Sequence, residues 1–566
     1  MLKFRLSIFL IGIIFFFIPF AAQATIIDFN IDPSYDSLGR TKVTAFLHQL
    51  GERAYFYVED EYYQTLDIEK RKDFTEALKG LSQEFDGSIY PQLTKTFGSE
   101  WKPGIDKDER ITVLITKIRE DAGGYFNSGD EYSVLQSSDS NEKEMLYLNA
   151  DYITSPLAKS FLAHEFSHLI TFNQKDRLRE IAEETWLNEA RAEYAPTLLG
   201  YDALYQGSNL QRRVDKFLKS PKDSLTEWKN LSPDYGAVNL FVQYLVDHYG
   251  VKILTDSLQS EKVGILSINE ALKKNGFTEN FSQIFTDWTI ALLVNDCGLG
   301  KKYCYLNPGL KTLRITPQIN YLPLVGDSTL SVTDYAKNWS GNWFKFIGGN
   351  GLLKMEFIGD QKVKFRVPYL LQDMSGAYSV NFLLLDNGHQ GTFYIPDFGK
   401  KYSSLIIIPS IQEKMSGFNG LEPFYQFIRS SSITNDTAQA AEEELIAQLL
   451  ARIEYLKNEI VKIQAQILAK NGTGISCQGL KANLYYGMRN SGDVRCLQEF
   501  LKSQGTEIYP EGLITGNFLG QTLAAVARFQ EKYAGEILTP LGLQKGTGYV
   551  GFSTIAKINK LLTIPR

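Results

Sequence analysis

The chain has 566 residues, enough for about three to five domains of roughly 100–200 residues each. Its 44% hydrophobic and 22% charged residues argue against long disorder and allow a large buried core. With 59 basic against 65 acidic residues and a net charge of −6, it lacks the basic excess that is typical of nucleic-acid binding, so no nucleic-acid partner is expected.

The N-terminal residues 1–24 have the pattern of a secretory signal peptide. A basic start precedes an apolar run over residues 6–22, which ends in the cleavage site Ala22-Gln23-Ala24. An uncleaved anchor is the alternative, since an apolar run of about 17 residues can just span a bilayer. No later stretch is long and apolar enough to do so. We therefore expect a secreted or envelope-associated protein without a membrane span after cleavage.

The four cysteines fall into two local pairs, Cys297 with Cys304 and Cys477 with Cys496. Export leads to an oxidising compartment, and an even number of closely spaced cysteines favours disulfides there. Two local disulfides are therefore predicted, and four free thiols are the less favoured alternative.

Residues 25–311 are predicted to form one mixed α and β domain. The runs at 110–116 and 144–150 are rich in Ile, Val, Leu, Thr and Tyr, which is typical of strands. After residue 156 the apolar residues recur with a helical period for more than a hundred residues.

The strongest functional signal is the H-E-x-x-H motif HEFSH at 164–168. His164 and His168 are four residues apart on a predicted helix, so both imidazoles project from one face and can bind one metal ion. Glu165 is placed to act as general base on a water molecule. With only five histidines in the chain, about 0.003 such motifs are expected by chance.

A catalytic zinc ion needs a third protein ligand and an open coordination position. A second helical pattern supplies Glu189, and twenty residues separate it from His168, which leaves room for a turn and a return helix. Glu183, Glu184 and Glu193 are competing carboxylates, and spacing alone does not choose among them.

HEFSH followed by TWLNEARAEY (185–194) resembles the gluzincin metallopeptidases, and more closely the hyicolysin family of secreted bacterial metallopeptidases. The resemblance implies a zincin-like catalytic domain with zinc as its cofactor. It matches Glu193 to a carboxylate that hydrogen-bonds a ligand histidine in thermolysin-like enzymes, with a solvated helix acid as the alternative. It implies His164, His168 and Glu189 as zinc ligands and Glu165 as the general base.

A hydroxyl donor is expected near the metal, because the oxyanion of the tetrahedral intermediate needs more than the metal to stabilise it. Residues 233–250 resemble the helix that carries this tyrosine in aminopeptidase N-like enzymes, and Tyr235 matches it. In that pattern a lysine stands between the tyrosine and a glycine, and this sequence lacks that lysine. Tyr194, Tyr201 and Tyr244 remain alternatives.

The glycine-rich segment 122–133 lacks the acidic partner of the aminopeptidase signature that holds a substrate amino group. Cleavage within proteins is therefore favoured over trimming from the N-terminus. The run at 144–150, just before the motif, is the candidate edge strand for pairing with an extended substrate, and an ordinary core strand is the alternative.

Residues 312–432 are predicted to form an antiparallel β-sandwich. Short runs rich in aromatic and branched residues recur there at about ten-residue spacing, separated by turn residues. His389 is expected to be a solvated turn residue, and His248 a satisfied or surface histidine rather than a metal ligand.

A polar linker, residues 433–444, leads to Ile and Leu heptads over residues 445–470. β-branched residues at one core position with mainly Leu at the other favour a parallel homodimeric coiled coil. Three heptads are marginal by themselves, so a single stalk helix on a neighbouring domain is the alternative.

Residues 475–562 resemble the small helical peptidoglycan-binding domain, through G-x-R-x-x-x-D-V-x-x-L-Q-x-F-L and G-x-F-x-G-x-x-T-x-x-A-V-x-x-F-Q. The resemblance implies peptidoglycan as a partner. Most of the matching apolar positions are core positions, so a generic interaction module is the alternative.

The sequence as a whole predicts an α+β multidomain chain that acts as a secreted zinc metalloendopeptidase on protein or peptide substrates. A peptidoglycan-stem endopeptidase is one alternative. A non-catalytic wall-binding adhesin with an inactive zincin core is another, although the intact Glu165 argues against it.

Overall fold

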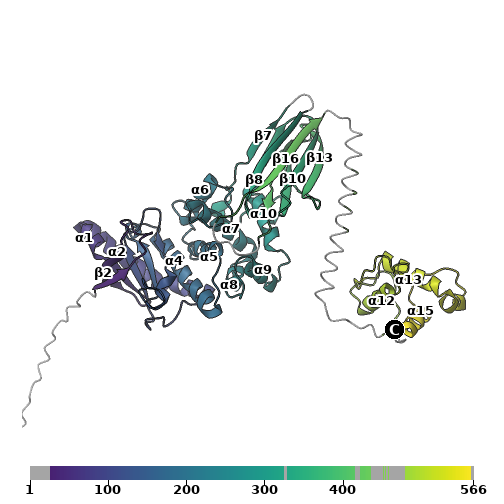
Figure 1. The fold of residues 1–566 in the computed structure, drawn as a ribbon, viewed down its shortest axis with the longest axis horizontal. Coiled ribbons are helices and arrows are strands. Elements are labelled where there is room, and N and C mark those ends of the chain that lie inside the picture. The colour runs from purple at the N-terminus through teal and green to yellow at the C-terminus, as the bar shows by residue number, and fades with distance from the viewer. Residues whose placement is uncertain are drawn as a thin grey trace, which may run out of the picture. The chain divides into compact units, whose positions relative to one another are not determined.

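The computed structural model describes residues 26–323, 328–414, 421–434 and 479–562, with the single positions 446, 450, 453 and 457. Contacts divide the chain into two compact units, Met1–Ala441 and Glu442–Arg566. Both contain helices and the first also contains large sheets, so the α+β class is confirmed (Figure 1). No helix in these described ranges is long and apolar enough to cross a membrane.

Several predictions fall outside the described residues. They concern the signal peptide, Cys477 and all but four positions of the heptad segment. Cys496 is disulfide-bonded.

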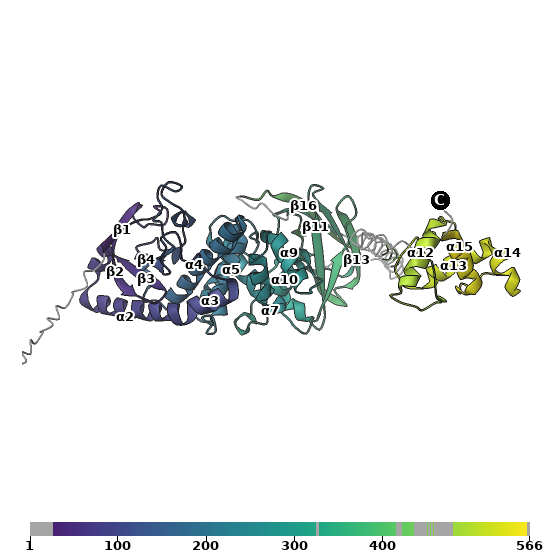
Figure 2. The ribbon, with the colours of Figure 1, turned by 90° about the horizontal axis from the view of Figure 1, so that it is seen from below.

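A six-stranded sheet with the order β1-β2-β3-β4-β6-β5 opens the first unit (Figure 2). The pairs β3·β4 and β4·β6 are parallel, and the others are antiparallel. Every residue of β4 and β6 is buried, as expected for strands covered on both faces. The strands are β1 Ile26–Asn30, β2 Lys42–Leu50, β3 Ala54–Glu59, β4 Ile111–Thr116, β5 Gly124–Tyr125 and β6 Met145–Asn149.

The prediction that residues 144–150 form an edge strand is wrong. β6 lies between β4 and β5, and the two-residue strand β5 is the edge. Burial on both faces explains the continuous apolar run of β6, which is typical of a central strand. The outer side of β5 pairs with no other described strand.

Helices dominate residues 158–294 of the first unit, as the periodicity predicts. α4 is buried along its whole length except at Lys159, and it packs against β6, α3 and α5. α1, α2 and α3 precede it, and α5 to α10 follow it. Their bounds are α1 Asp60–Thr65, α2 Ile68–Glu84, α3 Tyr90–Phe97, α4 Ala158–Phe172, α5 Thr185–Leu198, α6 Asn209–Lys219, α7 Ser232–Tyr249, α8 Lys252–Leu258, α9 Gly264–Lys274 and α10 Phe281–Val294.

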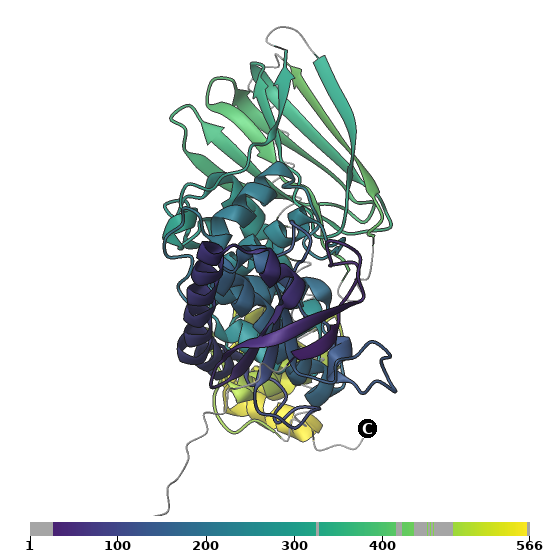
Figure 3. The ribbon, with the colours of Figure 1, turned by 90° about the vertical axis from the view of Figure 1, so that its left-hand side faces the viewer.

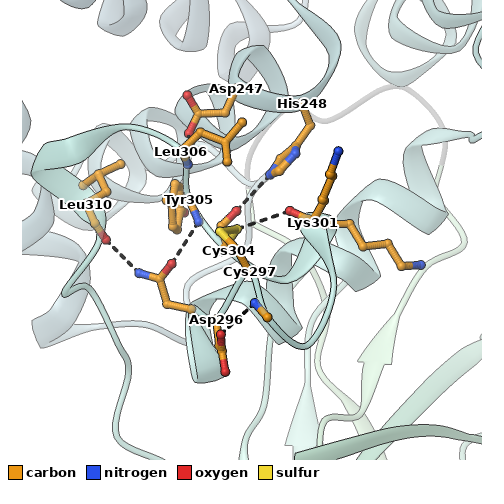
Figure 4. Close-up of a disulfide and its surroundings, with 12 residues drawn as sticks. Asp247, His248, Asp296, Cys297, Lys301, Cys304, Tyr305, Leu306 and Leu310 are labelled. Carbon is orange, nitrogen blue, oxygen red and sulfur yellow. Dashed lines mark hydrogen bonds between the residues drawn. A yellow bond between two sulfur atoms is a disulfide. The ribbon is translucent and has the colours of Figure 1, made fainter.

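The predicted disulfide Cys297–Cys304 is confirmed and closes the loop that follows α10 (Figure 4). His248, near the end of α7, bonds through Nε2 to the carbonyl oxygen of Cys304 at 2.9 Å. Asp247 accepts the backbone N–H of Leu306 at 2.8 Å. The loop therefore holds the C-terminal end of α7, and His248 is a satisfied histidine outside the predicted metal ligands.

Strands β7 to β16 follow the helices in the same unit. They form the region of teal to green arrows in Figure 3. One half pairs as β12-β11-β14-β9-β7 and the other as β13-β10-β16-β8. Among the described strands, the single pair Phe398↔Tyr402 joins the two halves. All pairs are antiparallel except that one and β7·β9. The bounds are β7 Gln318–Leu322, β8 Ser328–Ala336, β9 Phe344–Gly348, β10 Gly351–Gly359, β11 Phe365–Asp373, β12 Tyr378–Leu383, β13 Gln390–Phe398, β14 Tyr402–Ile407, β15 Ser410–Ile411 and β16 Tyr425–Thr434.

Both halves of this β region contribute to one core, which contains Phe346, Phe357 and Phe427 among others. Trp339 packs against the helices, with its ring centroid 4.9 Å from that of Phe281 on α10. His389 lies in a turn at φ 58° and bonds through Nδ1 to the carbonyl oxygen of Asp360. It is thus a turn residue, as predicted.

The second unit contains α12 Gly492–Ser503, α13 Gly520–Lys532, α14 Ala534–Ile537 and α15 Phe552–Leu562. Two glutamines make the same set of bonds in it. Gln498 accepts the N–H groups of Thr515 and Gly516 and donates to Thr522. Gln530 does the same with the corresponding residues of a second loop, Thr547, Gly548 and Thr554. The second unit therefore contains the same glutamine-held loop arrangement twice.

Candidate metal centre

Three residues of α4 form one wall of a cleft. His164 and His168 lie one turn apart, and their Nε2 atoms are 3.2 Å from each other. Glu165 lies beside them, and all three side chains are buried, with between 6% and 9% of their surface exposed. The helical spacing thus places both imidazoles at one point, as the motif predicts.

α5 runs beside α4 and brings Glu189 to the two histidines. Glu189 Oε2 lies 3.2 Å from His164 Nε2 and 3.6 Å from His168 Nε2. Among the described residues, this is the only group of three or more His, Cys, Asp or Glu side chains whose ligand atoms converge. Of the competing carboxylates, Glu183 pairs with Arg191 at 2.8 Å, and Glu184 accepts the indole N–H of Trp186 at 2.6 Å.

The donor set fits a zinc ion. Ligands about 2.05 Å from a tetrahedral zinc ion lie about 3.3 Å from one another, close to the three separations found here. Glu189 Oε2 is buried and has no hydrogen-bond partner of its own. A cation shared by the three atoms would satisfy this oxygen, and two imidazoles with one carboxylate are a known ligand set of catalytic zinc.

Side chains behind the centre orient both imidazoles. His164 Nδ1 lies 3.3 Å from Glu193 Oε1, and His168 Nδ1 lies 3.1 Å from Asn188 Oδ1. A proton donated from each Nδ1 leaves each Nε2 lone pair directed at the metal position. Glu193 is completely buried rather than solvated.

Glu193 is itself held by three donors from two other helices. Arg213 on α6 donates to both of its carboxylate oxygens. Asn209 Nδ2 on α6 and Asn239 Nδ2 on α7 donate to Oε2 at 3.1 and 3.0 Å. The orientation of His164 therefore depends on residues from three other helices, α5, α6 and α7.

The acidic groups of the centre differ in protonation. Burial raises the pKa of Glu165 above its ordinary value. Burial also opposes the charge on Glu189, but the two histidines outweigh it and hold the pKa of Glu189 well below the usual range. Arg213 likewise outweighs burial at Glu193 and lowers its pKa. Glu165 is therefore the carboxylate that most readily takes up a proton.

The edge strand β5 passes directly over Glu165. A Cβ added to Gly124 would lie 2.9 Å from Glu165 Cγ, and a Cβ added to Gly123 would lie 2.5 Å from the ring of Phe161 on α4. Only glycine allows the backbone to approach α4 this closely. The glycines of segment 122–133 therefore bring a free strand edge to the centre.

Tyr235, at the start of α7, reaches the same cleft. Its ring centroid lies 6.5 Å from that of His164, and its hydroxyl donates to Asn230 Oδ1 at 2.8 Å. Arg213 lies over the Tyr235 ring at 4.5 Å. Burial, followed by the charge of Glu189, raises the pKa of Tyr235, so its hydroxyl remains a donor at neutral pH.

The alternative tyrosines lie elsewhere. Tyr201 donates to Glu84, and Tyr244 donates to the carbonyl oxygen of Lys302, each at 2.7 Å. Neither these two nor Tyr194 lines the cleft. Tyr35 does, and its hydroxyl accepts a bond from Asn230.

The cleft has a volume of about 180 Å³. The sequence motifs identify the metal-facing residues and Tyr235, but not several polar residues around them. Asn188 stands beside Glu189 in the W-L-N-E segment, which is the one local signal for it. The lining residues that sequence reasoning missed include Tyr35, Arg119, Asn188, Asn209, Arg212, Arg213 and Asn230.

No family model and no curated protein matches the chain. Solved structures give only weak likenesses. The mitogen YPM of Yersinia pseudotuberculosis is 7% identical, with 20% of this chain and 91% of that chain covered and a TM-score of 0.15. The lysozyme inhibitor PliG of Aeromonas hydrophila is 10% identical, with 21% and 100% covered and a TM-score of 0.14. At such TM-scores these likenesses carry no argument.

Proposed function

We propose that this protein is a secreted or envelope-associated zinc metalloendopeptidase, with a gluzincin catalytic domain similar to the hyicolysin family. One observation carries the proposal. His164 Nε2, His168 Nε2 and Glu189 Oε2 converge next to Glu165, in a cleft bordered by an unpaired strand edge of the described sheet. The ligand set, the general base and the substrate-binding edge of a metallopeptidase thus occur at one place.

Glu165 is the proposed proton carrier. Bound zinc would supply a Lewis acid for the scissile carbonyl and would lower the pKa of water. Glu165 takes the proton of the attacking water and delivers it to the leaving amine. Its pKa is raised by burial, which brings the carboxylate closer to the neutral pH at which it must both accept and donate a proton.

Tyr235 is the proposed oxyanion donor. Its hydroxyl is protonated at neutral pH and lies in the cleft lining with His164 and Glu165. Asn230 and Arg213 hold the ring and hydroxyl in place, so little reorganisation is needed when negative charge develops on the substrate oxygen.

The substrate is proposed to pair with β5 as an extended strand. Residues 122–126 all line the cleft, and β5 uses only its inner side for pairing with β6. Backbone pairing at a free edge recognises polypeptide in extended form, whatever its side chains. This favours unfolded or flexible protein segments over short stem peptides that contain D-residues.

The second unit is proposed to attach the enzyme to the cell wall. Tyr485, Tyr486, Tyr549 and Phe552 are exposed, and they flank the bridge between Leu484 and Val550. Exposed aromatic rings offer apolar faces to sugar rings, which suits a peptidoglycan partner.

The decisive experiment measures zinc and cleavage together. Mature protein purified without added metal should contain about one zinc per chain, since one such site is described. A mixture of unstructured peptides should be cut at internal bonds and not shortened stepwise from the N-terminus. Absence of zinc together with absence of cleavage would contradict the proposal. Release of stem peptides from walls without cleavage of protein would favour the peptidoglycan-stem alternative.

A further inference from the structure

The cleft contains a guanidinium group without a carboxylate partner. Arg212 on α6 donates through Nε and Nη2 to Asn209 Oδ1, at 3.3 and 2.7 Å. Its neighbour Arg213 takes the carboxylate of Glu193. In the part of the chain that the structure describes, no Asp or Glu oxygen lies within ion-pair distance of Arg212. One cation of the cleft is therefore available for a ligand.

Arg212 is also partly withdrawn from water. Its guanidinium lies 5.1 Å from the centroid of the Phe161 ring, and the side chain lines the cleft. Burial and the adjacent Arg213 lower the pKa of Arg212 to about 10, so it keeps its charge at neutral pH. A desolvated guanidinium with no counter-ion is a strong partner for a carboxylate.

The direction of β5 shows which part of a substrate meets Arg212. Gly123 contacts the Phe161 ring, near the start of α4. Phe126 contacts Phe172, at the end of α4, with the ring centroids 6.0 Å apart. β5 therefore runs in the same direction as α4. A substrate paired antiparallel to β5 runs the opposite way, so its C-terminal side approaches Phe161 and Arg212.

The distance along the cleft also limits where Arg212 lies relative to the cleaved bond. Phe161 precedes His164 by three residues, which is about 4.5 Å along a helix axis. One residue of an extended substrate covers about 3.3 Å. Arg212 therefore lies opposite the first or second residue after the bond that faces the metal ligands.

We propose that Arg212 is a specificity-determining residue that binds a substrate carboxylate one or two residues after the cleaved bond. The inference rests on the proposed endopeptidase function and adds a substrate class to it. The carboxylate is either an Asp or Glu side chain or the terminal carboxylate of a short peptide. Both sources present the same planar group to the guanidinium.

Cleavage assays with matched peptides test the proposal. One set of internally quenched peptides carries either Glu or Gln at the first or second position after the cleaved bond. A further pair of peptides ends at that position, one with a free C-terminal carboxylate and the other with a C-terminal amide. We expect kcat/KM to be about tenfold higher or more for the acidic member, as for a charge-assisted bidentate bond. Arg212→Gln should bring that ratio close to one, and the pair with the larger ratio identifies the source.

A matched control removes charge from the same helix. Lys219, at the exposed end of α6, lies outside the cleft lining, so Lys219→Gln should keep the wild-type ratio. Arg212→Lys should keep part of the preference, because a lysine retains the charge but loses the two-pronged geometry. An unchanged ratio in Arg212→Gln would overturn the proposal.

Binding without turnover separates this proposal from the proposed function. In a Glu165→Gln background, fluorescence anisotropy with labelled Glu and Gln peptides should show about tenfold tighter binding of the Glu peptide, and Arg212→Gln should abolish the difference. Wild-type cleavage of both peptides at equal rates, with equal binding, would refute the role of Arg212 and leave the endopeptidase intact. A carboxylate preference in binding without cleavage of any peptide would refute the endopeptidase and leave the binding site.

Discussion

Gly124 of the edge strand faces the carboxylate of Glu165 so closely that a Cβ on Gly124 would lie 3.1 Å from Glu165 Oε1. The same Cβ would lie 2.5 Å from the carbonyl oxygen of Tyr147 on β6. The strand edge proposed to bind substrate and the proposed general base are therefore in direct contact, and a single methyl group would disturb both.

Gly124→Ala should lower kcat/KM by about tenfold or more, because a general base displaced by about 1 Å loses its alignment. Zinc content should be unchanged, since the three proposed ligands do not contact Gly124. Gly80→Ala on α2 is the matched control, because no atom lies within 4 Å of its added Cβ. Wild-type kinetics in Gly124→Ala would mean that Glu165 does not act from the position seen here.

Glu165→Gln and His164→Ala should separate chemistry from metal binding. Glu165→Gln keeps all three ligand atoms, so it should retain zinc and lose at least about 10²-fold in rate, the usual scale for a lost general base. His164→Ala should lose the metal itself. Zinc per chain by atomic absorption and initial rates on casein measure the two effects. Substantial activity in Glu165→Gln would rule out the proposed mechanism.

Glu193→Ala should weaken zinc binding by about 10- to 100-fold, the scale reported for groups that orient ligand histidines. It also leaves Arg213 buried and uncompensated, which should cost about 3–5 kcal/mol in the free energy of unfolding. Chelator competition measures the first effect and denaturant unfolding the second. Glu261→Gln, at an exposed acid outside the cleft, is the control. Unchanged zinc affinity would show that Glu193 serves stability alone.

The metal-facing part of the site follows from local sequence. Helical spacing alone places His164 and His168 together, and a return helix supplies Glu189. The supporting groups come from distant segments without such a pattern. Tyr35 lies 200 residues before Tyr235. Arg213 lies on the buried face of α6, twenty residues after Glu193, and no local spacing rule links the two.

The edge strand could not be predicted for a different reason. A strand is recognised in a sequence by a run of several apolar or branched residues. β5 consists of Gly124 and Tyr125 only, so it has no such run. Its position is set by contacts that glycine permits, and these have no hydrophobic signature. The repeated loop of the second unit has a short sequence signal, because T-G-N-F begins at 515 and T-G-Y-V at 547, each 17 residues after a buried glutamine, but two shared residues are too few to predict a repeat.

Glu131 and Glu144 should make the free energy of unfolding fall as pH rises. Burial and their mutual repulsion raise the pKa of Glu131 to about 9, and burial raises that of Glu144 to about 7, from 4.5. The folded state thus holds protons that the unfolded state releases, so the free energy of unfolding should fall as pH rises from about 5 to 9. Glu131→Gln should flatten this slope in thermal unfolding, whereas Glu76→Gln, at an exposed position of α2, should not. An equal slope in Glu131→Gln would mean that other groups cause it.

Removing residues 475–566 should separate attachment from catalysis. The second unit has its own core and shares no residue with the cleft lining, so cleavage of casein should change little. Sedimentation with purified cell walls should be lost. In the full chain, the double variant Tyr486→Ala/Phe552→Ala should weaken sedimentation with cell walls. Both side chains lie beside the Leu484–Val550 bridge, and 60% of Tyr486 and 86% of Phe552 is exposed. Leu541→Ala, also exposed but on the short turn that follows α14, is the control. If the truncated chain still sediments with walls, attachment resides in the first unit.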